Sequence, residues 1–242
     1  MKTMNETAAE PLVSPLNEIV FQHVFGSRDN TAPLLSFLNA VLPDAEHAIE
    51  KVELLPTKEL LPDDKLTCLD VKCILSDQTF RIVRIHVAND RDCNIVQRAL
   101  GYWGSACETS LNRCNLICRE MKAAAVISLL RFSLMPEEED FHSVFGMQSL
   151  VHSERNFNKY MELHFLELPK YLGLERKPLA DLTPEERWME YFAGRLDQQE
   201  QEELARADAA IGSAMAAAKT FLQDEESRRL CLERQKVVDG FK

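Results

Sequence analysis

The sequence lacks the cysteine pattern of a disulfide-stapled or zinc-binding protein. It contains seven cysteines, an odd number, and no two of them form a Cys-x-x-Cys pair. An odd count argues against a closed disulfide framework, and without paired spacing no zinc ribbon is indicated. We therefore expect free, buried thiols and a location in the reducing cytoplasm.

Long apolar runs and an excess of positive charge are also missing. No stretch approaches the roughly 20 apolar residues that a membrane helix requires, so we expect no membrane partner. Residues 1–15 have neither the apolar core of a signal peptide nor the composition of a basic transit peptide. Lys and Arg number 28 against 39 Asp and Glu, a net charge of −11. This argues against coating of nucleic acid by bulk charge, but not against a local basic groove.

The first part of the sequence alternates between helical and strand-like patterns. At 242 residues, the chain can form one large domain or a domain with an appendage. Ser14 and Pro15 are typical of a helix start, and Gly26 of its end. The remaining pattern predicts a second helix at 32–42, strands at 51–55, 65–75 and 79–88 with a hairpin turn at 76–78, a helix at 94–113, and strands at 123–134, 141–150 and 161–168.

The last third is rich in Ala, Glu, Gln and Arg. Thr183, Pro184 and Glu186 form the sequence signature of a capped helix start. We expect about three helices from there to the end, with breaks near Gly194 and near 220–224. The predicted division is a domain at 14–170 and a helical C-terminal extension at 181–242.

Six short motifs occur along the chain in a fixed order. They are NEIVFQHVFG at 17–26, LSFLNAVL at 35–42, DKLTCLDVK at 64–72, IVRIHVAN at 82–89, RALGYW at 98–103 and ELHFLELPK at 162–170. In these motifs and in its αβββαβ order, the chain resembles the PD-(D/E)XK nuclease family transposases, relatives of the recombination-promoting nucleases. The resemblance implies an α/β fold: a restriction-endonuclease-like core with a mixed sheet flanked by helices, followed by an α-helical C-terminal extension.

The resemblance also implies a set of site residues. Such nucleases hold a divalent metal, usually Mg²⁺, between carboxylates on adjacent strands. Asp70 stands at the first strand position, and Glu18 matches an acidic position on the first helix that could approach the metal. Where the family has Glu-x-Gln, this chain has Arg84-Ile85-His86. His86 therefore stands at the water-activating catalytic position.

Arg84 changes the chemistry that this position can support. A guanidinium cannot be deprotonated in proteins, so it cannot bind a metal, and it repels a cation nearby. At 4 Å and an effective dielectric constant of about 20, one pair of unit charges interacts by about 4 kcal/mol, and a divalent ion feels about twice that. Arg84 could instead pair with Asp70 across the strands, or contact a DNA phosphate. Lys72, on the face of Asp70, is a second cation for substrate contact or for pairing with Asp70.

The register of the predicted hairpin decides whether Asp70 and Arg84 meet. A two-residue turn between Ser76 and Thr79 would place Asp70 opposite Ile85. Asp70 and Arg84 share a face only if the hairpin contains a bulge or an odd-length turn. The resemblance implies such a feature.

Two functional hypotheses follow. The first is a DNA-acting nuclease or transposase-like protein of DNA recombination, with a degenerate site and weak or lost Mg²⁺-dependent cleavage, in the extreme a pseudoenzyme. The second is a non-enzymatic DNA- or protein-binding module derived from the nuclease fold. In that case Asp70 and Arg84 form an ion pair, and the C-terminal helices mediate homo-oligomerisation or bind a protein partner.

Overall fold

The computed structural model describes residues 13–42, 47–61, 64–89, 94–113, 123–152 and 160–240. Within them the strands are β1 (Ile49–Leu55), β2 (Cys68–Leu75), β3 (Phe80–Ala88), β4 (Ala124–Leu130), β5 (His142–Phe145) and β6 (Met161–Glu167). The helices are α1 (Glu18–Phe25), α2 (Ala32–Val41), α3 (Asp64–Thr67), α4 (Ile95–Arg113), α5 (Leu168–Gly173), α6 (Pro184–Ala193), α7 (Gln198–Ala207), α8 (Ala209–Leu222) and α9 (Glu225–Gly240), with a 3-10 turn, η2, at Leu179–Asp181.

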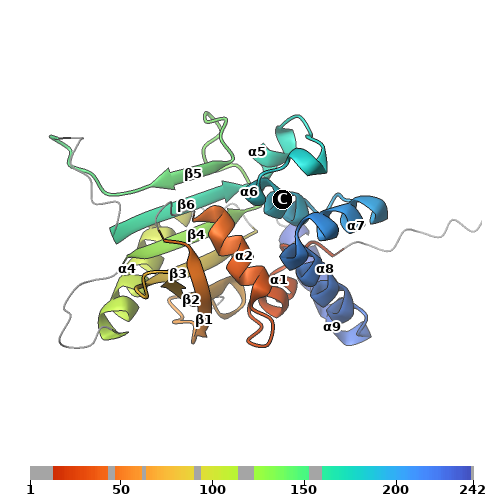
Figure 1. Ribbon diagram of the computed structural model, residues 1–242, viewed down its shortest axis with the longest axis horizontal. Helices are drawn as coiled ribbons and strands as arrows, with labels where there is room; N and C mark the ends of the chain where they lie inside the picture. Colours follow the sequence, from red (N-terminus) through yellow and green to blue (C-terminus); the bar gives the residue numbers. More distant parts are fainter. Residues whose placement is uncertain are drawn as a thin grey trace, which may run out of the picture.

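The strands form one mixed sheet in the order β1-β2-β3-β4-β6-β5 (Figure 1). β2 is antiparallel to both β1 and β3, the strands β3, β4 and β6 are mutually parallel, and β5 is antiparallel to β6. β3 and β4 are buried along almost their whole length, as expected for strands covered on both faces. The predicted α/β architecture, a mixed sheet flanked by helices and followed by C-terminal helices, is confirmed.

Residues that alternate along the strands contribute to apolar clusters on the two faces of the sheet. On one face, Cys68 and Val126 pack with Ala99 and Tyr102 of α4. On the other face, side chains such as Val71 and Ile127 pack with α1, α2 and the C-terminal helices. Asp70, between Leu69 and Val71, therefore points toward the α4 side of the sheet.

The C-terminal helices share the core of the sheet domain. Trp188 of α6 is fully buried and lies near Phe25 of α1 and Phe37 of α2, with ring centroids 5.5 and 5.9 Å apart. Buried side chains of α7, α8 and α9 belong to the same cluster. Figure 1 shows these helices gathered beside α1.

Several predicted boundaries differ from those observed. α1 begins at Glu18, because the side chain of Asn17, not Ser14, caps the helix by accepting from the Ile19 N–H. Residues 64–67 form a helical turn rather than the start of a strand. From Thr183 onward the described residues form four helices rather than about three, because Asp208 caps α8 and ends α7. The capping box at Thr183 and Glu186 is confirmed.

Two expectations about buried groups and membranes can be checked on the described residues. Cys68, Cys73, Cys107 and Cys231 are free and buried; the other three cysteines lie outside the described residues. Among the described helices, none has the length and apolarity to cross a bilayer.

Candidate functional site

Asp70 and Arg84 are directly opposite one another on β2 and β3. The register follows from the hairpin, in which Leu75 N–H donates to Thr79 C=O and Gln78 N–H to Leu75 C=O. The turn thus has three residues, and the last of them, Gln78, has φ +64°. A three-residue turn with its last residue in the left-handed region is a common hairpin connection. The odd-length turn that the pairing requires is therefore present.

The two side chains form a buried, bidentate ion pair. Arg84 Nε donates to Asp70 Oδ1 and Nη2 to Asp70 Oδ2, each at 2.6 Å. Nη2 also donates to the Lys58 carbonyl at 2.7 Å, and the Lys58 N–H donates to Asp70 Oδ2 at 3.0 Å. Arg84 is 1% exposed and Asp70 7%. A bidentate arginine–carboxylate pair combines opposite charges with a fixed hydrogen-bond geometry, so each group holds the other in place.

A tyrosine from α4 and an aspartate from α3 complete the surroundings of the pair. The Tyr102 ring centroid lies 4.9 Å from Arg84 Cζ, a cation–π contact. Its hydroxyl donates to Asp64 Oδ1 at 2.6 Å, and Asp64 Oδ2 accepts the N–H groups of Leu60 and Leu61. Sequence reasoning assigned no site role to Asp64 or to Tyr102. The only available signal was that both lie in the motifs that carry the resemblance.

The ionisation states of these groups follow from their surroundings. Burial acts to lower the pKa of the Arg84 guanidinium, but the hydrogen bonds and charge of Asp70 raise it above its ordinary value. Burial, with the neighbouring Cys68 and Asp64, raises the pKa of the Tyr102 hydroxyl. Burial and the charge of Asp64 raise the pKa of the Cys68 thiol to about 12. At neutral pH the site therefore contains a permanent cation, a phenol and a thiol.

Glu18 lies away from this pair. Its carboxylate, 2% exposed, accepts from Arg234 of α9, with Oε1 2.9 Å from Nη2 and 3.2 Å from Nε. The helix that carries it packs on the face of the sheet opposite to Asp70. In the described part of the chain no contact joins Glu18 to Asp70.

His86 and Lys72 lie on either side of the pair along the sheet. His86 is 1% exposed, and its ring packs edge-on against Tyr102 with the centroids 5.1 Å apart. Lys72 is opposite Glu53 of β1, with Nζ 3.6 Å from Glu53 Oε2, and also lies over the Phe80 ring. The structure thus brings Asp70, Arg84 and His86 into one neighbourhood, whereas Lys72 makes its ion pair toward β1.

The residues present do not fit a divalent metal. Both oxygens of Asp70 already accept hydrogen bonds from Arg84, and a fixed cation lies where a second carboxylate would be needed. Cys68 is a thiol rather than a thiolate at neutral pH, which makes it a poor ligand. Across the described ranges, no group of three or more His, Cys, Asp or Glu side chains is placed to hold a metal ion. Glu108, a carboxylate on α4, is exposed and paired with Lys58.

A pocket lies on the α4 side of the pair. It has a volume of about 370 Å³, and its lining includes Leu60, Arg98 and Tyr102. Tyr102, which covers Arg84, therefore separates the ion pair from this pocket. Arg84 Nη1 is buried and has no hydrogen-bond partner among the described residues.

Fold and site together define a class of protein. A mixed sheet with an antiparallel β1-β2-β3 unit, a parallel β4 and helices on both faces is the arrangement of a restriction-endonuclease-like protein. The family model of the PD-(D/E)XK nuclease family transposases matches residues 15–240. The chain belongs to this family, which supports a nuclease-like function and a DNA substrate; nucleases of this type generally use divalent metals. A search of curated proteins found no match, and neither did a search of solved structures.

Proposed function

We propose that this chain is a DNA-acting member of its family in which an ion pair has replaced the metal site, so that Mg²⁺-dependent cleavage is weak or lost. The observation that carries the proposal is the bidentate contact between Arg84 and Asp70, both buried, at the two facing strand positions where the family places carboxylates. Asp70 remains the residue at the first metal position, with His86 beside it at the water-activating position.

The closed contact favours a binding function over residual catalysis. For Asp70 to hold a metal, Arg84 would have to leave a site where it makes three hydrogen bonds and a cation–π contact. If it left, an unpaired guanidinium would need another anion or access to water. A DNA phosphate is such an anion, and Nη1 is a donor that it could use. Arg84 is then a phosphate-binding residue, and Lys72 a second one near it.

The first experiment measures cleavage. Supercoiled plasmid is incubated with the wild-type chain and with Asp70→Ala, in Mg²⁺, in Mn²⁺ and in EDTA. We expect no metal-dependent nicking by the wild-type chain above the Asp70→Ala background. Metal-dependent cutting that disappears in Asp70→Ala would refute the loss of the site.

The second experiment rebuilds the carboxylate. Arg84→Glu places two carboxylates at directly opposed positions, so Mn²⁺ binding, measured by calorimetry, should appear where the wild-type chain shows none. Arg84→Gln is the matched control, because it removes the cation without adding a ligand. The double variant Arg84→Glu/His86→Gln restores the Glu-x-Gln motif and should bind at least as well. If neither carboxylate variant gains binding over Arg84→Gln, the pair is not what blocks the metal.

The binding function has its own test. Fluorescence anisotropy with a duplex DNA should show binding that survives EDTA and weakens as salt rises, since phosphate contacts release counterions. Arg84→Gln and Lys72→Gln should each weaken it, whereas Lys51→Gln, on the outer edge of the sheet, should not. Absence of binding at low salt would favour a protein-binding module, with the C-terminal helices as its predicted contact surface.

A further inference from the structure

Among the strands that the structure describes, β5 lies at one edge of the sheet. β5 is the last strand in the order, next to β6. The Glu167 N–H donates to the Phe141 carbonyl at 2.7 Å, which makes these two residues a hydrogen-bonded pair. Such pairs alternate along an antiparallel ladder, so the backbone groups of His142, Val144 and Gly146 point away from β6. A row of this kind is a template for another strand.

This edge is rich in exposed apolar residues. Residues 141–152 include no Asp, Glu, Lys or Arg, although charged residues make up 28% of the chain. Val144 is 54% exposed, Phe145 43% and Met147 44%, and Leu150 and Val151 are exposed further on. Figure 1 shows this segment continuing beyond β5 as an arm that projects from the body.

The opposite edge of the same sheet is built differently. β1, at the other end of the order, carries Glu50, Lys51 and Glu53 within its seven residues. Charges on an edge strand discourage pairing with another chain, which is how proteins ordinarily protect such edges. The β1 edge therefore carries charges that discourage pairing, whereas the β5 segment carries no Asp, Glu, Lys or Arg.

We propose that β5 pairs with β5 of a second copy of this chain, antiparallel and around a two-fold axis, to give one continuous sheet through a dimer. A two-fold contact satisfies both exposed edges at once, because the same surface serves on each side. Each copy carries a net charge of −11, so contact through a segment without charge costs the least repulsion.

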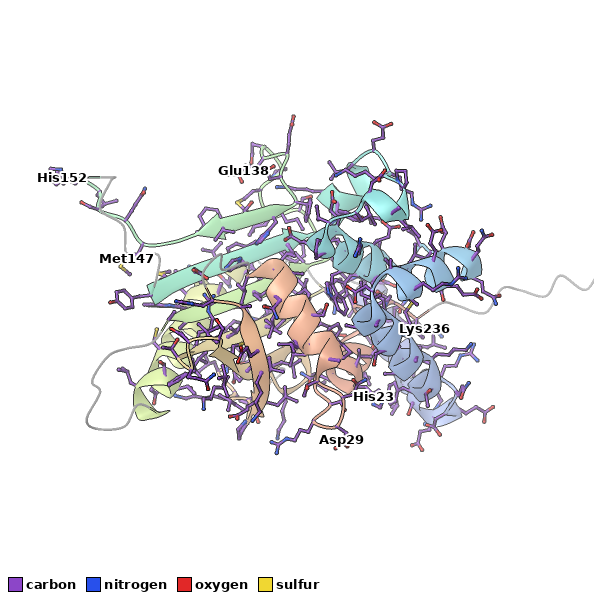
Figure 2. All side chains as sticks on the ribbon, viewed as in Figure 1. His23, Asp29, Glu138, Met147, His152 and Lys236 are labelled. Carbon is purple, nitrogen blue, oxygen red and sulfur yellow. The ribbon has the colours of Figure 1, made fainter. Side chains whose placement is uncertain are left out.

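The charges that flank β5 favour this orientation. The acidic run 137–140 precedes the strand, and Figure 2 shows Glu138 at one end of β5 and Met147 and His152 at the other. Antiparallel pairing keeps the acidic runs of the two copies at opposite ends of the contact and places each near the uncharged arm of the other copy. Parallel pairing would bring the two acidic runs together.

The outward-facing backbone groups set a register. With the axis at Val144, the two Val144 residues form a hydrogen-bonded pair, and His142 faces Gly146 of the partner subunit. Phe145 and Met147 then lose solvent exposure on the face of the sheet where Phe145 already packs on Phe165. The C-terminal helices, the surface that the sequence predicts for association, are not needed for this contact.

Sedimentation of the full chain over a wide concentration range tests the proposal. We expect a monomer–dimer equilibrium, with the dimer weakened at least tenfold by Val144→Lys and by Val144→Pro. The proline removes only an N–H that points away from β6, so the thermal midpoint should change little. Leu230→Lys, which adds the same charge at an exposed leucine of α9 (45% exposed), is the control and should leave the dimer intact. A wild-type chain that stays monomeric, forms open-ended aggregates, or loses its dimer only in Leu230→Lys would overturn the proposal.

Cross-linking provides a second readout, which does not depend on folding of the proline variant. In a hydrogen-bonded antiparallel pair the facing Cα atoms are about 5.5 Å apart, within the range that a disulfide spans. Val144→Cys should therefore form a covalent dimer with oxidised glutathione, well above the level of the wild-type chain and of Leu230→Cys. Equal cross-linking in all three, or preferential cross-linking of Leu230→Cys, would assign the contact elsewhere. DNA binding and cleavage are not needed for either readout, so these results stand apart from the proposed function.

Discussion

At the scale of single residues, the Arg84–Asp70 pair governs the largest expected change in stability. Asp70→Ala leaves a guanidinium that is 1% exposed without its counter-ion, which typically costs about 3–5 kcal/mol. The double variant Asp70→Leu/Arg84→Met removes both charges and should recover most of that loss, because apolar replacement of a buried pair is often neutral or stabilising. Urea denaturation of the two variants measures both effects.

A control for this prediction comes from an exposed pair. Arg206 and Glu202 lie one helical turn apart on α7, and both side chains are more than half exposed. Arg206→Ala should change the free energy of unfolding by no more than about 0.5 kcal/mol. If Asp70→Ala costs as little as Arg206→Ala, the buried pair does not hold the two strands as its geometry implies.

The sequence was informative about the identity of the residues at this site and less so about their partners. The motif shows that Arg84 stands at an acidic position of the family, and it offers pairing with Asp70 as one of two alternatives, the other being contact with a DNA phosphate. The contacts of Tyr102 with Asp64 could not be predicted, because they join α4 to a turn of helix that the alternation of 65–75 had suggested to be strand. Nor could the contact of Glu18 with Arg234, which are 216 positions apart.

At the scale of elements, the β2–β3 hairpin shows that an alternation of apolar residues predicts strands but not their register. The alternation of apolar residues predicts both strands, but a one-residue change in the turn reverses which face each side chain occupies. The turn contains no glycine, and Gln78 takes the left-handed conformation that glycine would favour. The predicted turn at 76–78 is confirmed, but residue type alone did not distinguish this three-residue connection from a two-residue one. The C-terminal break at Asp208 was missed for a similar reason, since an aspartate within a helical pattern is as easily a surface residue as a cap.

The prediction at this scale concerns a chain of ionisable side chains across β3, β6, β5 and α6. Arg81 pairs with Glu162, which lies 3.4 Å from His164 Nε2; His164 Nδ1 is 2.9 Å from His142 Nε2, and His142 in turn contacts Glu185. Burial lowers the pKa of His164 below its ordinary value of 6.5, with hydrogen bonding to Glu162 acting in the opposite direction. Burial tends to raise the pKa of Glu162, but His164 and Arg81 bring it below its ordinary 4.5.

Both shifts make the protein less stable in acid. The unfolded chain binds the His164 proton more tightly than the folded chain does, so this contribution is complete above about pH 6.5 and is lost as the pH falls toward the lower folded pKa. The contribution of Glu162 is present above pH 4.5 and is lost as the pH falls through its folded pKa. The free energy of unfolding, measured by urea denaturation, should therefore decrease from pH 7.5 to 5.5. One group can contribute at most about 1.4 kcal/mol per pH unit to this slope. His164→Gln should flatten the profile; a profile equal to that of the wild-type chain would contradict the assignment.

At the scale of the whole molecule, the two predicted parts, 14–170 and 181–242, share one apolar core. Glu18 of α1 pairs with Arg234 of α9, and the Ser14 N–H donates to Gln235 at 3.0 Å. The Trp188 indole N–H donates to Ser36 of α2 at 3.2 Å. Because α6, α8 and α9 cover apolar side chains of α1 and α2, separating the two parts would expose much of the cluster. We therefore expect them to unfold as one cooperative unit.

The two tryptophans of the chain test this directly, one in each predicted part. Trp188→Phe leaves Trp103 on α4 as the only indole, whose N–H donates to the Tyr160 carbonyl, and Trp103→Phe leaves Trp188 in the shared core. In each variant, the fluorescence and far-ultraviolet circular dichroism transitions in urea should coincide, since a two-state unit gives one midpoint to every probe. Comparison within a variant removes the effect of the substitution itself on stability. If fluorescence in the Trp103→Phe chain changed at lower urea than its circular dichroism, α6 would detach before the sheet unfolds, and the C-terminal helices would be an appendage rather than part of the core.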